Sequence, residues 1–434
     1  MRQTNKIRKG IAWLLCTVLV LGILPMLPQM SMQISAAENA ASVFVDGVEL
    51  HAGGQEYFKN GDTAVSGATG TYEDHSAYYD TAGELWLNNL EAHTIKANGN
   101  LTIYVCNNQA TNTNIVTATQ NETAIEVTGY LTIRYGGYGG GTGSLTVESD
   151  GKEAIQAGSG MTVSDGVEVK ARAKSGATAI SSGGVLKIDG IRTKLEAAGD
   201  GSTGKGIFAQ QSIYVKNSAV LTAFGGAAAY ESPSGIDKSG YGYEDYNVFT
   251  GDAAPGTQAA KDTVLDGYKY IRIEPTGVAN VKTLTELQAA AQNQYISLIN
   301  VMNDITITDT VYVRRAVTIQ SPDASNVSKL IRGKSHTDVI LDFDGANGHK
   351  SDVVTLKNII VDGNKDGNTQ TASPALKSKS ILVNLESGTV IENNHAKEGA
   401  AIYVNHYSTV TMKEGSEIRN NVSESVGTVY VIGN

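Results

Sequence analysis

The sequence predicts an all-β protein that winds into a right-handed parallel β-helix, a solenoid of stacked coils, in two consecutive segments with a short capping helix between them. Two observations predict this fold. Short triplets that alternate apolar and polar residues return every 25 to 27 residues, and the 434-residue chain has few bulky aromatics, with 6 Phe and 2 Trp. Strands stacked about 4.8 Å apart would turn equivalent aliphatic side chains toward one shared core. A β-sandwich or a row of Ig-like domains also has short strands, but their strand pattern does not return intact at a fixed period.

Residues 1–37 are predicted to be a secretory signal peptide. Four basic residues precede an apolar run at 11–27, and small residues follow it, with cleavage expected after Ala36 or Ala37. A retained transmembrane anchor is the alternative, but two prolines interrupt the run. We therefore expect an exported protein that contacts a membrane only through this signal before cleavage.

The repeat defines the first segment, residues 38–275. Three sets of residues recur together: 154–155, 179–180 and 206–207; 161–163, 186–188 and 213–215; and 167–169, 194–196 and 220–222. Two of the sets also occur 30 residues earlier, and the extra length falls in the Gly-rich stretch 135–141, which predicts a loop.

A boundary between the segments is predicted near Pro275. A strand at 270–273 precedes this proline, and the Gly-, Ala- and Tyr-rich stretch between residues 225 and 262 is interpreted as a long loop or an extended last coil. Residues 276–434 then form the second segment. The chain stops at Asn434 just past a strand, so we expect the sequence to be the N-terminal part of a longer protein.

The second segment is predicted to begin with a helix and to continue as new coils. Thr283 and Glu286 form a capping-box pattern, and Leu284, Leu287 and Ala291 share one helical face. Such a helix would cover the open end of the solenoid, where apolar core and unpaired strand edges are exposed. Strands are predicted at 305–307, 311–313, 317–319, 339–341 and 353–356, and the stretches 390–394 and 401–404 return 27 residues later. The first of these carries an Asn pair that is predicted to stack at a turn, because Asn tolerates left-handed φ.

Charge and cysteine content exclude several functions. The formal net charge is −10 at pH 7, so no nucleic-acid-binding surface is expected. The low charged fraction, 18%, does not describe a disordered tail. Cys16 would leave with the signal, and the remaining Cys106 cannot form an intramolecular disulfide. Cys106 follows an apolar run and is predicted to be buried.

Both segments resemble β-helical families. The region from about 43 to 275 resembles the β-helical carbohydrate-binding-domain proteins of Gram-positive bacteria through Asn100-Leu101-Thr102-Ile103, Gly129-Tyr130-Leu131-Thr132-Ile133, Gly143-Ser144-Leu145-Thr146-Val147 and Tyr270-Ile271-Arg272-Ile273. Residues 280–434 look similar to the pectate-lyase-like repeats of bacterial adhesins through Val361-Asp362-Gly363-Asn364 and Gly399-Ala400-Ala401-Ile402-Tyr403-Val404. These resemblances imply display at the cell surface of a Gram-positive bacterium and contact with a polysaccharide or surface glycan. They do not name a ligand.

The chain lacks the motifs of enzymes built on this fold. Pectin hydrolases of the fold carry Asn-Thr-Asp, Asp-Asp, Gly-His-Gly and Arg-Ile-Lys in that order, and none of these occurs here. Paired carboxylates that would flank a glycosidic bond cannot be assigned. Lyases need calcium-binding Asp residues, and Asp342, Asp344, Asp352, Asp362 and Asp366 do cluster in the sequence, but Asp between strands is usually a turn residue.

One loop matches part of a calcium site. Asp362, Asn364 and Asp366 place oxygen ligands at alternate positions before Gly367, as in the first half of an EF-hand loop. The twelfth position is Ser373, so the bidentate acid is missing, and a strand precedes the loop. A solvated turn without a cofactor is the favoured interpretation, and Ca²⁺ is the alternative.

Tyrosines are the candidate glycan contacts, because sugar C–H faces stack on aromatic rings. In two late triplets that repeat, the aliphatic residues should point inward, and Tyr403 and Tyr430 should point outward on adjacent coils. Tyr104 and Tyr214 have the same apolar-flanked pattern in the first segment. Three more tyrosines decorate its long loop: Tyr241, Tyr243 and Tyr246. The alternative is that outward tyrosines stack on one another and shield the sheet.

We therefore expect a secreted or cell-surface, non-catalytic β-helix protein that binds polysaccharide or mediates adhesion. A polysaccharide lyase or glycoside hydrolase whose active site is unrecognised, or lies beyond Asn434, is one alternative. A passive surface stalk that presents a C-terminal module is another.

Overall fold

The computed structural model describes residues 38–53, 56–64, 75–106, 113–119, 121–137, 142–345, 350–367 and 371–432. The predicted signal peptide at 1–37 lies outside the described residues. From Asn39 onward the chain forms one compact unit.

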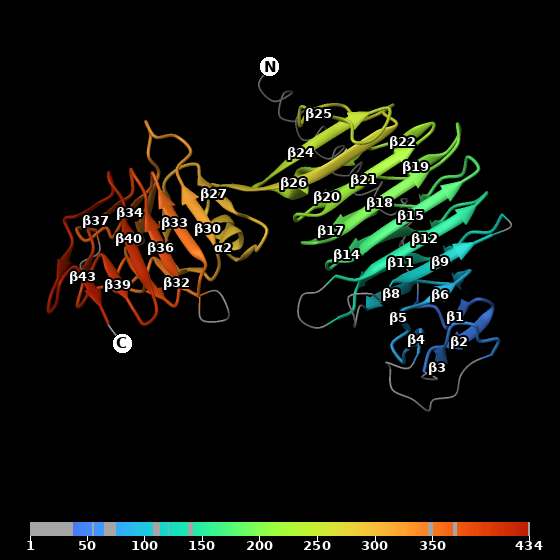
Figure 1. Ribbon diagram of the computed structural model, residues 1–434, viewed down its shortest axis with the longest axis horizontal. Coiled ribbons are helices and arrows are strands. Elements are labelled where there is room, and N and C mark those ends of the chain that lie inside the picture. The colour runs from blue at the N-terminus through green and yellow to red at the C-terminus, as the bar shows by residue number, and fades with distance from the viewer. Residues whose placement is uncertain are drawn as a thin grey trace, which may run out of the picture. The chain divides into compact units, whose positions relative to one another are not determined.

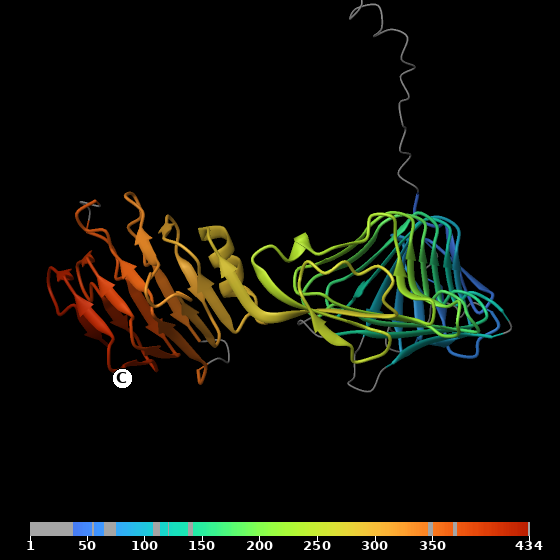
Figure 2. The ribbon, with the colours of Figure 1, turned by 90° about the horizontal axis from the view of Figure 1, so that it is seen from above.

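The described chain is nearly all β and forms a parallel β-helix of about 12 turns, as predicted (Figure 1). In each coil of the first segment the chain passes through three sheets in turn, and each strand pairs with its equivalent in the next coil. Two sheets belong to the first segment alone, with 8 and 9 strands, and a third of 14 strands continues into the second segment. Figure 2 shows the strands of successive coils side by side.

Among its described residues, the first segment contains 25 strands and part of β26. The 8-stranded sheet holds β1 (Ser42–Val45), β2 (Val48–His51), β7 (Ile95–Ala97), β10 (Ile125–Val127), β13 (Ile155–Ala157), β16 (Ile180–Ser182), β19 (Lys205–Ala209) and β22 (Ala228–Glu231). The 9-stranded sheet holds β3 (Glu56–Phe58), β4 (Ala77–Tyr79), β5 (Glu84–Asn88), β8 (Leu101–Cys106), β11 (Tyr130–Tyr135), β14 (Gly160–Ser164), β17 (Leu186–Asp189), β20 (Ile213–Lys216) and β23 (Ile236–Asp237). The third sheet begins with β6 (Glu91–Ala92), β9 (Asn114–Ala118), β12 (Ser144–Asp150), β15 (Glu168–Lys174), β18 (Lys194–Gly199), β21 (Val220–Gly225), β24 (Glu244–Gly251), β25 (Thr257–Ala259) and β26 (Tyr270–Val281).

The second segment repeats the same plan with shorter strands. The third sheet continues through β27 (Leu298–Val301), β30 (Val317–Gln320), β33 (Val353–Lys357), β36 (Leu382–Leu385) and β40 (Thr409–Met412). Two 5-stranded sheets and a strand pair complete it: β28 (Ile305–Ile307), β31 (Lys329–Arg332), β34 (Ile360–Asp362), β37 (Val390–Glu392) and β41 (Glu417–Arg419); β29 (Val311–Val313), β32 (Leu341–Asp344), β35 (Leu376–Lys379), β39 (Ile402–Val404) and β43 (Val429–Val431); and β38 (His395–Ala396) with β42 (Val422–Ser423).

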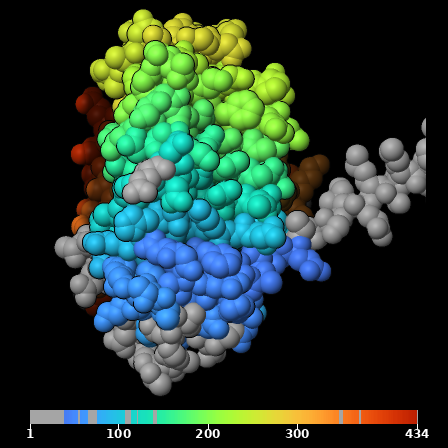
Figure 3. Space-filling view, turned by 90° about the vertical axis from the view of Figure 1, so that its right-hand side faces the viewer, coloured from blue at the N-terminus to red at the C-terminus, as the bar shows by residue number. Residues whose placement is uncertain are grey.

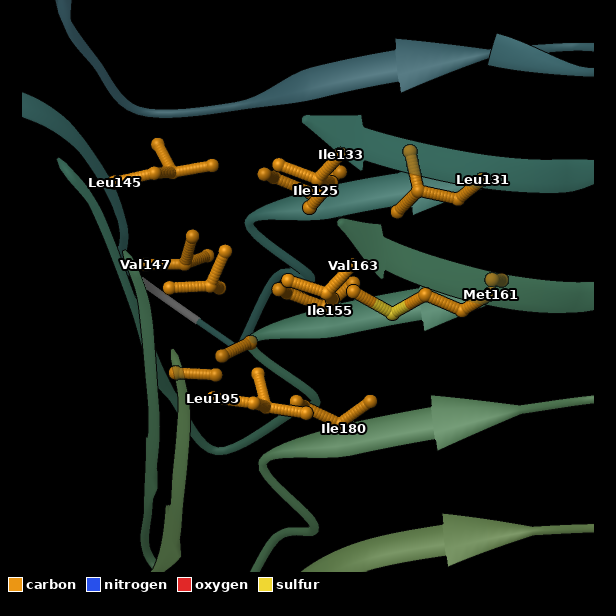
Figure 4. Close-up of a cluster of buried hydrophobic side chains, with 14 of the residues drawn as sticks. Ile125, Leu131, Ile133, Leu145, Val147, Ile155, Met161, Val163, Ile180 and Leu195 are labelled. Carbon is orange, nitrogen blue, oxygen red and sulfur yellow. The ribbon is translucent and has the colours of Figure 1, made fainter. Parts of the chain in front are cut away.

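The core of the first segment is a column of aliphatic side chains. Ile155 pairs with Ile125 on one side and Ile180 on the other, and all three are fully buried. Figure 4 shows these side chains one above another, and the space-filling view shows the coils following one another in sequence order (Figure 3). Side chains alternate along a strand, so the pairing of one residue determines which side chains of its triplet point into the core and which point outward.

The predicted register is confirmed for two of the three triplet sets and is shifted by one residue in the third. Val169 pairs with Leu195, so Glu168 rather than Val167 lies opposite Lys194. The shift arises at the preceding turn, where Asp165 has a positive φ and Val167 donates its N–H to Ser164. Val167 is consequently a buried residue before the strand rather than part of it.

Both ends of the first segment depart from the parallel pattern. At the N-terminal end, β1 pairs antiparallel with β2 and β7, and β4 pairs antiparallel with β3 and β5. At the other end, β24 and β21 both pair antiparallel with β26. The interpretation of the stretch between residues 225 and 262 as a long loop is therefore wrong in part. Every second residue of β24 near Val248 is buried, which is the pattern of a strand that covers the last coil.

The capping helix is confirmed as α2 (Leu284–Gln292). The hydroxyl of Thr283 accepts a hydrogen bond from the Glu286 N–H, and the Glu286 carboxylate accepts from the Thr283 N–H, which completes the capping box. Leu287 and Ala291 are buried in the second core, as the predicted helical face requires. The buried hydrophobic residues form two clusters, which end at Ile273 and begin at Ala279, on either side of Pro275.

The predicted Asn stack is also present. Asn393 and Asn420 both have left-handed φ, near +57° and +53°. The side chain of Asn421 accepts hydrogen bonds from the backbone and side-chain nitrogens of Asn394, at 3.0 and 2.9 Å, and donates to the Ile391 carbonyl. The strand predicted at 339–341 instead begins at Leu341, because Val339 and Ile340 use their carbonyls to accept hydrogen bonds from the preceding coil.

A buried carboxylate lies where β24 meets the end of α2. Glu244 is 7% exposed, and its carboxylate accepts hydrogen bonds from the Ser218 hydroxyl and the Asn293 amide, at 2.9 and 3.0 Å. Burial raises the pKa of Glu244 above its usual value of 4.5, although both hydrogen bonds oppose that shift. The ionised carboxylate therefore costs stability in the folded state.

The Glu244→Gln variant should become more stable relative to wild type as the pH rises, so the difference in their free energies of unfolding should grow with pH. A carboxyl with a raised folded pKa binds its proton more tightly in the folded state, so its contribution falls as the pH increases from about 4.5 through the folded pKa. Glutamine does not titrate and can accept from Asn293 through its amide oxygen. Urea unfolding of both proteins between acidic and neutral pH measures the difference, and a constant or shrinking difference would contradict this expectation.

Candidate functional site

The outer face of the sheet β29–β32–β35–β39–β43 carries a single registered row of side chains. Tyr312 pairs with Asp342, Asp342 with Lys377, Lys377 with Tyr403, and Tyr403 with Tyr430. In β29, β32, β35 and β39 the residues on either side are buried, which leaves Tyr312, Asp342, Lys377 and Tyr403 facing outward. Tyr430 continues the row by register, although both of its neighbours in β43 are exposed. We call this set the tyrosine row. It places aromatic rings at both ends of a flat surface with one ion pair between them.

The predicted neighbours Tyr403 and Tyr430 lie on adjacent coils, as their 27-residue spacing indicated. Their ring centroids are 5.4 Å apart and the rings are inclined by 65°, an edge-to-face arrangement. Both side chains are partly exposed. Partial burial, and then the neighbouring Tyr430, raise the pKa of Tyr403, so the Tyr403 phenol is a neutral hydrogen-bonding group at physiological pH.

The middle of the tyrosine row is polar and internally neutralised. Lys377 lies 4.0 Å from Asp342, and on the adjacent outward positions Lys379 lies 3.9 Å from Asp344. Burial raises the pKa of Asp342 despite the opposing effect of Lys377. These groups can accept and donate hydrogen bonds to hydroxyls without presenting a net charge.

Sequence reasoning missed the third aromatic residue of this row. Tyr312 is 43% exposed and occupies the centre of Val311-Tyr312-Val313, which has the same apolar-flanked pattern as the triplets of Tyr403 and Tyr430. The signal was therefore present, but only the tertiary register places Tyr312 on the same line as the other two. A cavity of about 450 Å³ adjoins it, lined also by Ala291, Gln292, Gln294, Arg314 and Arg315.

In the first segment Tyr104 belongs to a different aromatic row. Its ring stacks on Trp86 with centroids 4.2 Å apart and an inclination of 9°, and the Arg134 guanidinium lies 5.4 Å from its centroid on the side of the next coil. Tyr57 and Tyr78 precede Trp86 in the same register. This geometry covers both faces of Tyr104 with neighbouring side chains, and its role as a glycan contact stays a prediction.

The other predicted tyrosines differ in their surroundings. Tyr214 is partly exposed between Lys187 and Asp237, and its glycan contact also stays a prediction. Tyr241 does not decorate a loop surface: it is buried, its hydroxyl donates to the Ala219 carbonyl at 2.5 Å, and it stacks on Tyr246. Tyr243 and Tyr246 pack against the second and first cores, respectively. Tyr241 and Tyr246 therefore pack at the last coil of the first segment, and Tyr243 packs against the second core.

The predicted calcium loop is held by protein contacts. The Asp362 carboxylate accepts from the Asn364 N–H at 2.9 Å and lies 3.7 Å from Lys329, while the Asn364 side chain donates to the Arg332 carbonyl at 3.0 Å. Asp366 is exposed on the turn. In the part of the chain that the structure describes, no group of three or more His, Cys, Asp or Glu side chains gathers to hold a metal ion. The solvated turn that the sequence favours stays a prediction, and calcium binding stays its alternative.

Two further observations concern the described residues as a whole. Cys106 is buried, as predicted. No helix between residues 38 and 432, within the described ranges, has the length and apolar character needed to cross a lipid bilayer.

The stacked parallel coils are those of a β-solenoid, and the second segment carries the tyrosine row on its outer face. In a comparison with known families, residues 278–414 match the model of a putative pectate lyase-like adhesive domain. The matched range contains four members of the tyrosine row, and Tyr430 follows it. No curated protein and no solved structure matches the chain significantly. A domain described as adhesive fits a role in binding or adhesion and favours a non-catalytic protein.

Proposed function

We propose that the protein is a secreted, surface-associated and non-catalytic adhesin that binds polysaccharide along the tyrosine row of its second segment. The observation that carries this proposal is the register of Tyr312, Tyr403 and Tyr430 on one outer sheet face inside or next to the region that matches an adhesive domain. The signal peptide predicted from the sequence supports export, and the Gram-positive cell surface is the location that the resemblance of both segments implies.

The chemistry of the row suits a glycan. Aromatic rings offer faces for sugar C–H groups, while the phenols and the Asp342–Lys377 pair offer hydrogen bonds to hydroxyls. Tyr312 and Tyr403 are three strand spacings apart, which is about 14 Å at the usual spacing of parallel strands. An extended polysaccharide that follows the sheet can therefore contact both ends of the row at once.

Replacing both Tyr403 and Tyr430 by alanine should weaken retention of the protein on the polysaccharide it binds by about tenfold or more, since each lost ring contact is worth about 0.5–1.5 kcal/mol. Affinity electrophoresis of the purified protein through gels that contain a panel of neutral and charged polysaccharides measures this retention. Phe44→Ala is the matched control, because Phe44 is an exposed aromatic residue on β1 of the first segment.

The control and a melting curve separate glycan binding from a purely structural role. Unchanged retention together with a lowered melting temperature of the double variant would show that the tyrosines only shield the sheet. Retention by none of the panel polysaccharides would overturn the proposed function.

A further inference from the structure

We propose that the cavity beside Tyr312 is a subsite for an oxyanion carried by a saccharide, with the Arg314 guanidinium as the group that binds it. This inference rests on the proposed function and extends it, because it assigns a charge class to the glycan and an orientation to its binding. The cavity has a volume of about 450 Å³ and lies at one end of the tyrosine row, against the last turn of α2.

Two adjacent arginines line the cavity and have different roles. Arg315 is partly buried and donates to the carbonyls of Ile296, Ala316 and Ala290. It thereby satisfies the C-terminal end of α2 and fixes the wall of the cavity. Burial lowers the pKa of Arg315 to about 10, which still leaves it charged at physiological pH.

Arg314 is the available cation. It is exposed, and its guanidinium carbon lies 5.6 Å from the centroid of the Tyr312 ring. Burial raises the pKa of Asp342 and the charge of Arg314 opposes that shift, but the ion pairs of Asp342 and Asp344 are formed with Lys377 and Lys379. A planar guanidinium can bind a carboxylate or sulfate through two parallel hydrogen bonds.

The remaining lining residues favour a sugar as the carrier of that oxyanion. Tyr312 adds an exposed ring, and Gln292 and Gln294 add amides that can bond hydroxyls. A free inorganic anion would use Arg314 alone and would gain nothing from the ring. The protein as a whole has a net charge of −10, so its overall charge repels polyanions. A preference for a polyanion must therefore come from a local site.

The test uses three polymers with one glucan backbone: dextran, carboxymethyl dextran and dextran sulfate. We expect wild-type protein to be retained about tenfold more strongly by at least one charged dextran than by dextran, and Arg314→Gln to remove this preference while leaving retention on dextran unchanged. The charged polymer that is preferred identifies the oxyanion as carboxylate or sulfate. Arg172→Gln is the matched control, because Arg172 is an exposed arginine on β15 of the first segment.

The outcomes distinguish this inference from the proposed function. If Arg314→Gln and Arg172→Gln reduce the preference equally, long-range charge explains it and the subsite is wrong. If wild-type protein binds charged and neutral dextran alike, and only the Tyr403 and Tyr430 double variant weakens binding, the subsite is wrong but the adhesive role stands. Retention by no polysaccharide overturns both.

Discussion

Replacing Arg332 by alanine should lower the free energy of unfolding by roughly 3–5 kcal/mol, the largest single effect that we expect in the second segment. Arg332 is the last residue of β31 and is only 1% exposed, so a guanidinium lies inside the coil where an aliphatic residue would be expected. It donates to the carbonyls of Asp338, Ser373 and Pro374, which belong to two different connections between strands.

The physical reason for the large effect is that the variant loses two things at once. Alanine removes the donor from three carbonyls in partly buried hydrogen bonds and opens a cavity the size of the arginine side chain. Burial lowers the pKa of Arg332 to about 10, so the charge itself is costly, but the hydrogen bonds offset that cost. Lysine should be intermediate, because one ammonium cannot reproduce the planar fork of donors.

Urea unfolding measures the effect, and Arg172→Ala provides the reference. Arg172 is exposed on a strand of the first segment, and its truncation should change stability by no more than about 0.5 kcal/mol. An Arg332→Ala protein that unfolds at the same urea concentration as Arg172→Ala would show that the buried hydrogen bonds contribute nothing.

Replacing Ile155 by alanine should cost about 2–5 kcal/mol, because Ile155 lies in the middle of the aliphatic column. It is fully buried between Ile125 and Ile180 (Figure 4), so the cavity left by truncation has the side chains of two other coils as walls and cannot close easily. Valine at the same position should cost only about 0.5–1.5 kcal/mol.

The adjacent residue is the control for this prediction. Gln156 follows Ile155 in β13 but points outward and is exposed, so Gln156→Ala should change stability by no more than about 0.5 kcal/mol. Similar losses for the two alanine variants, measured by thermal or urea unfolding, would contradict the inward and outward alternation on which the coil depends.

The features that were predicted correctly are those determined by local pattern. The 25- to 30-residue intervals give the register of Ile125, Ile155 and Ile180 because a strand alternates its side chains and a shift of one residue would expose the core. The capping box of Thr283 and Glu286 involves neighbours in sequence, so it could be recognised without a fold. The Asn pairs lie 27 residues apart, so the repeat interval indicated that they stack on adjacent coils.

The features that were missed depend on contacts between distant residues. At both ends of the first segment, antiparallel strands cover the terminal coil. These strands are not part of the repeat, so the repeat could not predict their pairing. Tyr241 was expected outside and lies inside because β24 folds back over the coil. Arg332 lies inside because acceptors from residues 338 and 373–374 converge there.

The sequence by itself determined that this protein is a β-helix, where its coils repeat, which side chains form the aliphatic column and that Tyr403 and Tyr430 are neighbours. Only the tertiary structure decided that Tyr312 joins them on one line and that a cavity lined by the exposed Arg314 adjoins it. The physical reason is that the alternation of side chains along one strand determines which of its residues face the core. A surface site instead depends on the register between coils, and the turns that connect the coils vary in length.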